Sequence, residues 1–331
     1  MRLRAYRQIS GAWNTPVALA CSGGVDSTAL VIIAIEALKR GKVAPFVVFH
    51  VDHLTRPESS LEADVVRALC DGDGVPFVAL TVAESGLVPG RSTEDLWRER
   101  RYRELARAAS ALGVRSIVTA HTQDDQVETV LMRMFSGSSL GGMSPEVRAG
   151  FSHDHLTLLR PFLSVTRREL EEVLRIAAVT PITDPSNADT AYRRNAVRHE
   201  VVPAVQRVFP GFEEALLRSV GLAEADARFC DRQAGGVYAH AREIIPGGIR
   251  LERELIRGLD RAVASRVIRL AALDLISGDE NRELTFERVD AVLAATDGRT
   301  GTLIELPYGL HARIERDAIV MINIRKGDAI D

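Results

Sequence analysis

The sequence predicts an α/β protein whose doubly wound, mainly parallel sheet is followed by a mostly helical C-terminal domain that ends in short strands. Within about the first 125 residues, short apolar runs rich in Val and Phe alternate with segments of helical periodicity. This alternation is typical of parallel strands covered by helices on both faces. After about residue 212 helical patterns dominate, and three β-like runs close the chain. A length of 331 residues favours about two domains.

Each element is predicted from its own pattern. Strands are expected at short apolar or β-branched runs, and helices where apolar residues recur every three to four positions. We expect first-domain strands at 17–21, 45–51, 76–81, 115–120 and 158–161, and helices at 28–39, 60–71, 92–112, 124–135 and 166–178. The polar segment 182–195 is irregular, and a boundary near 205–212 gives domains 1–207 and 208–331. The second domain has predicted helices at 212–241, 251–277 and 285–295 and strands at 302–306, 310–314 and 318–322.

The composition is that of a globular protein, with one asymmetry among the basic residues. Apolar residues make up 46% and charged residues 26%, and the net charge of −3 by itself argues against a nucleic-acid partner. Only three of the 42 basic residues are lysines, namely Lys39, Lys42 and Lys326. Two alternatives would explain this asymmetry: a coding bias towards arginine, or the use of guanidinium groups to bind phosphates. In either case a Walker-type or Schiff-base lysine has almost no candidate.

Cysteine usage and hydropathy indicate a soluble cytoplasmic protein with no membrane partner. Cys21, Cys70 and Cys230 form no C-x-x-C pair, which excludes a disulfide framework and a spaced zinc site. The apolar run 16–20 is too short for a signal peptide, and the longest uninterrupted apolar stretch, 29–35, is far below a membrane span.

The strongest chemical signal is a glycine-containing loop between a predicted strand and a predicted helix. It reads Cys21-Ser22-Gly23-Gly24-Val25-Asp26-Ser27-Thr28. Two glycines allow positive φ and close backbone approach, and a helix N-terminus favours anions. The hydroxyls add donors, and Asp26 is a candidate to hold Mg²⁺ against phosphates. The Walker pattern and G-x-G-x-x-G are both absent.

This loop resembles that of the PP-loop (N-type) ATP pyrophosphatases. The resemblance implies ATP cleavage between the α- and β-phosphates, transfer of AMP to an oxygen of the substrate, and displacement of AMP by a nucleophile. It implies ATP contacts from Ser22, Gly23, Gly24, Val25, Asp26 and Ser27. Thiolating members need a sulfur carrier and glutamine-dependent members need a glutaminase domain, and the sequence favours neither.

Further motifs narrow the resemblance to the tRNA(Ile)-lysidine synthetases. They lie in order at 50–56, 100–102, 119–129, 137–143, 159–163, 184–187 and 192–198. The match extends over about residues 15–205, and it is specific as an ordered set. The resemblance implies ligation of free L-lysine to C2 of the wobble cytidine of an isoleucine tRNA with a CAU anticodon. ATP and Mg²⁺ would be required, with no DNA partner, and a homodimer is left open as the oligomeric state.

The same resemblance suggests roles for particular side chains. Catalysis is expected from Asp26, Arg101, Asp125 and Glu128, and lysine binding from Asp125 and Glu128. The adenine side of the ATP site is expected to include His50, His53 and His121. Because Arg194, Asn195 and Arg198 lie beside Tyr192 in a polar stretch, we expect them to contact the tRNA. Arg194 and Arg198 share a face if this segment is helical.

Structural alternatives stay open for most of these candidates. Asp125 and Glu128 also fit an exposed helical charge pair, Asp124 fits a helix N-cap, and the histidines fit core positions. Arg101 fits a solvated face, and Arg194 and Arg198 fit the start of an amphipathic helix. Two other functions compete: a PP-loop amide ligase acting on a small molecule, and an ATP-binding regulatory protein without turnover. The arginines at 194 and 198 favour the RNA substrate.

Overall fold

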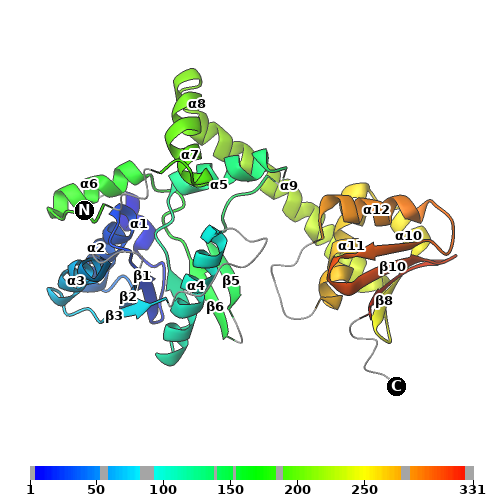
Figure 1. Cartoon of the computed structure of the whole chain (residues 1–331), viewed down its shortest axis with the longest axis horizontal. Helices are drawn as coiled ribbons and strands as arrows, with labels where there is room; N and C mark the ends of the chain where they lie inside the picture. The colour runs from blue at the N-terminus through cyan, green and yellow to red at the C-terminus, as the bar shows by residue number, and fades with distance from the viewer. Residues whose placement is uncertain are drawn as a thin grey trace. The chain divides into compact units, whose positions relative to one another are not determined.

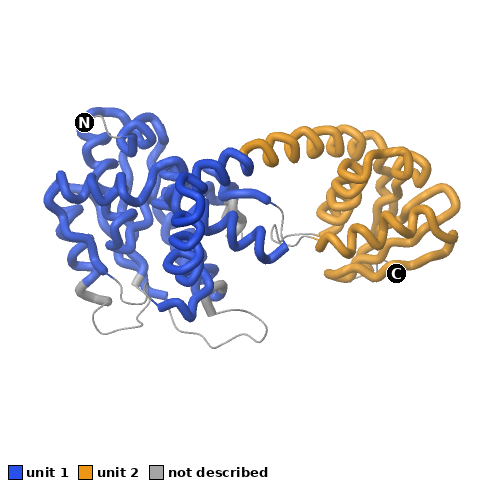
Figure 2. The backbone as a smooth tube through the Cα atoms, turned by 90° about the horizontal axis from the view of Figure 1, so that it is seen from above, with its two compact units in different colours: residues 1–220 blue, residues 221–331 orange. Residues whose placement is uncertain are grey.

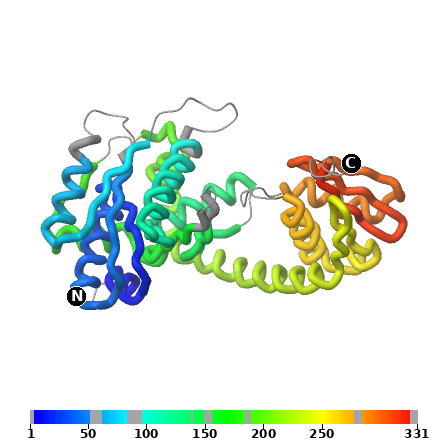
Figure 3. Tube along the Cα trace, turned by 90° about the horizontal axis from the view of Figure 1, so that it is seen from below, coloured from blue at the N-terminus to red at the C-terminus, as the bar shows by residue number. Residues whose placement is uncertain are grey.

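The chain forms two compact units, residues 1–220 and 221–331 (Figure 2). The computed structural model describes residues 4–52, 59–82, 93–137, 140–151, 154–183, 189–276 and 284–324. The division falls inside helix α9 (Phe212–Ala241), beyond the boundary that the sequence suggests at 207. The long helix thus contributes residues to both units, and Figure 3 follows the chain through it by residue number.

Unit 1 is built on a six-stranded sheet of order β3-β2-β1-β4-β6-β5. All neighbouring pairs are parallel except β5 with β6, which form an antiparallel hairpin. The strands are β1 (Val17–Ala20), β2 (Phe46–Asp52), β3 (Phe77–Thr81), β4 (Ser116–Val118), β5 (Glu146–Phe151) and β6 (Asp154–Leu159). The expected mainly parallel sheet is therefore confirmed (Figure 1).

Helices cover both faces of this sheet because alternate strand residues point to opposite sides. On β1, Val17 and Leu19 belong to one core cluster, whereas Ala18 belongs to the other. The first cluster includes side chains of α1 (Arg4–Ile9), α2 (Val25–Lys39), α3 (Ser59–Asp71) and α6 (Arg167–Ala177). The second is closed by α4 (Thr93–Ala111). The parallel strands all direct their carboxyl ends to one edge, where ligands bind in such sheets.

Three further helices and a π-helical turn complete the part of unit 1 that bears on the site. Helix α5 (Gln123–Phe135) follows β4, and α7 (Arg193–Ala196) runs into a π-helical turn (Val197–Val201) and α8 (Val202–Val208). Val127 and Leu131 of α5 pack with Val197 of the π-helical turn in a small apolar cluster. This packing brings the polar stretch before residue 205 onto α5.

Unit 2 contains a five-stranded antiparallel sheet of order β7-β8-β11-β10-β9 packed with helices. Its strands are β7 (Arg242–Ile245), β8 (Gly248–Glu252), β9 (Leu303–Leu306), β10 (Leu310–Ile314) and β11 (Ala318–Asn323). Its helices after α9 are α10 (Arg253–Arg257), α11 (Arg261–Leu275), α12 (Phe286–Thr296) and the 3₁₀ turn η3 (Pro307–Gly309). The three predicted C-terminal strands are confirmed.

Two sequence predictions about regular structure are wrong. The expected helix at 251–277 is interrupted, because its first residues belong to β8 and α10 ends at Gly258 before α11 begins. The β5–β6 hairpin was expected only as a short strand at 158–161. Within the described residues, no helix is long and apolar enough to cross a membrane.

Candidate functional site

The glycine loop lies where predicted, between the carboxyl end of β1 and the first turn of α2. Gly23 has a φ of +84°, a conformation that favours glycine. The loop is held by its own hydroxyls: Thr28 Oγ1 donates to Gly23 O at 2.8 Å, and Ser27 Oγ donates to Gly24 O at 3.2 Å. The backbone N–H of Ser22 in turn donates to Ser27 Oγ at 3.2 Å. These contacts fix the loop around the helix N-terminus, where backbone N–H groups attract anions.

Gly23 is also required for packing. A Cβ atom at this position would lie 2.3 Å from Ile182 Cδ1, well inside van der Waals contact. The backbone N–H of Ile182 donates to Gly23 O at 2.9 Å. A Cβ atom on Gly24 would meet only Ser22 Oγ, at 3.6 Å. A side chain at position 23 would therefore displace Ile182, whereas a Cβ atom at position 24 would clash with nothing.

Asp26 lies in the first turn of α2 with its two carboxylate oxygens in different surroundings. Oδ2 accepts a hydrogen bond from Arg167 Nη1 at 3.2 Å, whereas Oδ1 is buried and has no partner among the described residues. Burial raises the pKa of Asp26 to about 6, although Arg167 opposes the shift. A buried carboxylate oxygen without a donor beside an anion-binding loop fits a ligand of Mg²⁺, which takes one or two carboxylates together with phosphate oxygens.

The N-terminal turns of α5 and α6 are hydrogen-bonded to each other next to this loop. Asp124 Oδ2 accepts from the backbone N–H of Arg167 at 2.8 Å, and Gln123 N–H donates to Val165 O at 2.8 Å. Thr122, and not Asp124, is the N-cap of α5, so the N-cap alternative for Asp124 is wrong. Asp124 instead caps the first turn of the neighbouring helix. Asp124 and Asp125 both act electrostatically on Asp26, so the helix starts surround one charged site.

The predicted lysine-binding and tRNA-binding side chains meet in one network, here named the Arg–carboxylate cluster: Asp125, Glu128, Arg194 and Arg198. Arg194 donates to Glu128 Oε2 and to Asp125 Oδ1, both at 2.8 Å. Arg198 donates to Glu128 Oε1 at 2.6 Å and to Asp125 Oδ1 at 3.3 Å. The two arginines thus lie on one helical face, as the sequence suggested. Because Glu128 is only 2% exposed, the exposed-charge-pair alternative is wrong for this residue.

Burial and charge set the protonation of this cluster. Burial raises the pKa of Asp125, but Arg194, the backbone N–H of Thr122 and Arg198 outweigh it, so the net shift is downward. Burial also lowers the pKa of Arg198, whereas its bond to Glu128 more than compensates. The cluster therefore holds Asp125 as a carboxylate and Arg198 as a cation.

The remaining predicted residues make their described contacts outside the Arg–carboxylate cluster. His50 is buried, and its Nδ1 donates to Cys21 O at 2.9 Å, which links the ends of β1 and β2. His121 is hydrogen-bonded through Nδ1 to Thr119 Oγ1 at 2.8 Å, and burial lowers its pKa far below the usual range, so it is neutral. Arg101 lies on α4 with its guanidinium carbon 5.4 Å from the ring centroid of Tyr102.

Three predicted residues are not among the loop and cluster contacts described so far. His53 lies outside the described residues. Asn195 Nδ2 donates to Asp189 O at 2.9 Å, within its own segment. Arg101 makes no hydrogen bond to the glycine loop in the part of the chain that the structure describes.

Sequence reasoning missed Arg167, which contacts the glycine loop through Asp26. Its only local signal is its position directly after the N-cap Thr166, which does not distinguish a site residue from an ordinary helix start. It also missed how the 137–143 loop is held. Gln126 Nε2 donates to Met143 O and Arg133 donates to Gly141 O, both at 2.8 Å, so this loop is anchored on α5.

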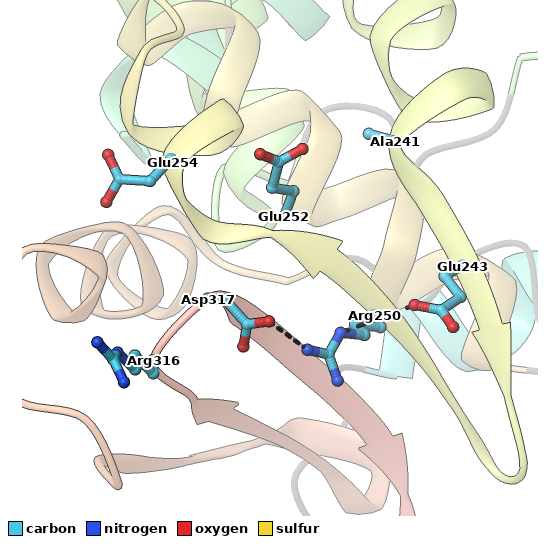
Figure 4. Close-up of a pocket in the computed structure, with 7 residues that line it drawn as sticks. All are labelled: Ala241, Glu243, Arg250, Glu252, Glu254, Arg316 and Asp317. Carbon is cyan, nitrogen blue, oxygen red and sulfur yellow. Dashed lines mark hydrogen bonds and ion pairs between the residues drawn. The ribbon is translucent and has the colours of Figure 1, made fainter.

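A hollow in unit 2 contains none of the predicted site residues (Figure 4). Arg250 lies between two acidic side chains there, 2.9 Å from Asp317 and 3.7 Å from Glu243. Its lining is Ala241, Glu243, Arg250, Glu252, Glu254, Arg316 and Asp317. Four acidic residues against two arginines do not favour a phosphate ligand.

Comparison with known proteins finds relatives that match most of this chain. The PP-loop domain family matches residues 4–205. The chain is 35% identical to the tRNA(Ile)-lysidine synthase of Thermobifida fusca over 96% of its own length and 94% of that protein. Identity to the Streptomyces coelicolor protein of the same name is also 35%, over 98% and 89% of the two chains. The Thermus thermophilus synthase is 38% identical, but the match covers 45% of its length.

The fold also matches a solved structure. The U34-tRNA thiolase NcsA from Methanococcus maripaludis superposes with a TM-score of 0.55 at 15% identity, covering 66% of this chain and 78% of that one. At this identity the likeness shows the fold alone. The PP-loop match over residues 4–205 and the 35% identity to synthases over almost the whole chain show that the chain belongs to the tRNA(Ile)-lysidine synthase family.

Proposed function

We propose that this site joins free L-lysine to C2 of the wobble cytidine of an isoleucine tRNA with a CAU anticodon, through an adenylated intermediate. In the first step cytosine O2 attacks the α-phosphorus of ATP, the bond to the β-phosphate oxygen breaks, and pyrophosphate leaves. In the second step the lysine ε-amine attacks C2, the C2–O2 bond breaks, and AMP leaves with that oxygen. Modified cytidine pairs with A instead of G, so the tRNA reads AUA in place of AUG.

One observation carries the proposal: the anion-binding loop and the Arg–carboxylate cluster share one edge of the sheet. Asp26 of the loop responds electrostatically to Asp125 and Arg198 of the cluster. An enzyme of this chemistry needs a triphosphate site and a site for a cationic amine close to each other, because both reactants act on one base.

The loop would bind the phosphates through its backbone N–H groups and the hydroxyls of Ser22 and Ser27. Asp26 would hold Mg²⁺ through the buried Oδ1, which has no donor among the described residues. When bound, this ion would neutralise phosphate charge and so favour departure of pyrophosphate. Asp26 serves this role as a carboxylate, the form that a bound Mg²⁺ ion would itself stabilise.

Asp125 and Glu128 would bind the lysine ammonium and take up its proton as the C–N bond forms. Their buried position supports this role, because an ammonium pairs more strongly with a carboxylate away from water. Arg194 and Arg198 would have two roles. They lower the pKa of Asp125 and so keep it a carboxylate, and the exposed fractions of their side chains, 22% and 28%, leave them able to contact tRNA phosphates. His50, His121, Arg101 and Asn195 stay predictions, as do a homodimer and a cytoplasmic location.

The decisive experiment uses the whole chain, ATP, Mg²⁺, radiolabelled lysine and an isoleucine tRNA transcript. We expect label in the RNA with a wobble cytidine and none when that base is replaced by uridine. No incorporation by a preparation that binds ATP would overturn the proposal and favour a small-molecule amide ligase.

Two variants separate the half-reactions. Asp26→Ala is expected to abolish transfer of AMP from α-labelled ATP to the transcript. Glu128→Ala is expected to allow adenylation while raising the KM for lysine. Equal lysine KM values for the Glu128 variant and the wild type would contradict the assignment of lysine binding to the cluster.

A further inference from the structure

The phosphate loop lacks the lysine that many triphosphate-binding loops place on the β- and γ-phosphates. Lys39 lies in the last turn of the 15-residue helix α2 and pairs with Asp73. At 1.5 Å per residue it is roughly 20 Å from the loop at the other end of that helix. Lys42 follows the same helix end, and Lys326 lies outside the described residues. Among the described residues, a side-chain cation that acts beside Mg²⁺ on the leaving pyrophosphate would therefore be an arginine.

Arg167 is an arginine of the described residues whose side chain contacts the loop. Its Nη1 donates to Asp26 Oδ2 at 3.2 Å, and its Nε lies 3.6 Å from Glu171. Arg194 and Arg198, by contrast, each make at least two bonds inside the Arg–carboxylate cluster. Arg167 therefore has fewer hydrogen bonds to hold its guanidinium in place than the two arginines of the cluster.

The backbone of Arg167 is fixed, whereas its guanidinium is held, in the part of the chain that the structure describes, only by long contacts with Asp26 at 3.2 Å and Glu171 at 3.6 Å. Its backbone N–H donates to Asp124 Oδ2 at 2.8 Å, at the first position of α6 after the N-cap Thr166. Its side chain is 36% exposed, and a single nitrogen joins it to Asp26. A short rotation at the side-chain end is enough to change its partner without moving the helix.

We propose that Arg167 binds the pyrophosphate part of ATP and takes the place of the missing lysine. In the nucleotide-free protein, its bond to Asp26 neutralises that poorly solvated carboxylate. With ATP bound, the guanidinium turns from Asp26 to the β- or γ-phosphate oxygens, to which its planar fork can donate two bonds. It then stabilises the negative charge that develops on pyrophosphate as the bond to the α-phosphorus breaks. This inference rests on the proposed function only in taking ATP as the nucleotide.

The test measures binding of inorganic pyrophosphate and of AMP, both with Mg²⁺, by isothermal titration calorimetry. Arg167→Ala is expected to weaken pyrophosphate binding about tenfold to a hundredfold, the usual effect of losing a hydrogen bond between charged groups. AMP binding is expected to stay within about twofold, because AMP lacks the β- and γ-phosphates. Arg167→Lys should restore part of the pyrophosphate affinity, since it keeps the charge and loses the fork.

Arg168→Ala is the matched control, because Arg168 is the next residue of the same helix and its side chain is exposed. It is expected to bind both ligands like the wild type. Pyrophosphate affinity in Arg167→Ala equal to that of the Arg168 variant would overturn the proposal, and so would equal losses of AMP and pyrophosphate binding. Lysidine formation by the wild type, measured separately, tests the proposed function, so a failure of one inference is not mistaken for a failure of the other.

Discussion

Replacing Glu128 by glutamine tests whether the Arg–carboxylate cluster is a strong buried interaction. Glu128 accepts three N–H bonds from two guanidinium groups, at 2.6, 2.8 and 3.1 Å. The amide keeps one acceptor oxygen, but its NH₂ group faces a guanidinium donor and cannot accept. Hydrogen bonds to charged groups contribute about 1.5–3 kcal/mol each, but both arginines are partly exposed. We therefore expect Glu128→Gln to lower the free energy of unfolding of unit 1 by about 2–3 kcal/mol.

The assay is urea unfolding of the whole chain, followed by circular dichroism, with the transition of unit 1 fitted separately. Glu172→Gln is the matched control. Glu172 also accepts two bonds from one guanidinium, Arg175, at 2.6 and 2.7 Å, but that pair is on the surface. Exposed pairs contribute little because water competes for both charges. If the Glu128 variant unfolds at the same urea concentration as the Glu172 variant, burial does not strengthen the cluster and the reasoning fails.

Three further predictions concern stability. Asp26 has a pKa of about 6 in the folded state and an ordinary value of 3.8, so between these values the native state binds a proton that the unfolded state has lost, and the stability of the protein falls as pH rises. Asp26→Asn should therefore raise the free energy of unfolding at pH 7 by about 1–3 kcal/mol and lose that advantage near pH 4, as measured by urea unfolding at each pH. Gly23→Ala should lower the free energy of unfolding by at least about 1 kcal/mol, and with it the melting temperature, whereas Gly24→Ala should not, since only Gly23 has a positive φ and a clash. Similar melting temperatures for the two variants would refute this. Arg253→Ala should destabilise unit 2 by roughly 3–5 kcal/mol, because three backbone carbonyls lose their hydrogen-bond donor. Limited proteolysis should cut unit 2 of the variant faster than that of the wild type, and equal rates of cleavage would contradict the prediction.

The parts of the fold that could be predicted depend on local sequence. Helix α9 begins and ends where its pattern predicts, and the strands at 310–314 and 318–323 follow from β-branched, apolar runs. The β5–β6 hairpin was missed because Glu146 and Arg148 give its first strand a polar composition. Leu251 was assigned to a helix because a short apolar run does not distinguish a buried strand from a buried helix.

The candidate site shows the same division between local and tertiary information. The glycine loop could be predicted because strand, glycines and helix start are contiguous in the chain. The bonds of Arg194 and Arg198 to Glu128 could not, since they join segments that only the packing of Val197 against α5 brings together. Spacing shows that two arginines share a face, but it does not show what that face meets. Arg167 was missed for this reason as well.

Asp125 performs two tasks with its two oxygens, and this restricts how the protein can change over evolution. Oδ2 accepts the N–H and hydroxyl of Thr122 and so caps α5, whereas Oδ1 accepts the two arginines. A descendant that lost this carboxylate would lose a helix start and a charge partner in a single step. One compensating substitution could restore the helix start or the charge balance, but not both. Lineages are therefore expected to leave this position only through several coordinated replacements, while exposed neighbours such as Arg168 can drift one at a time.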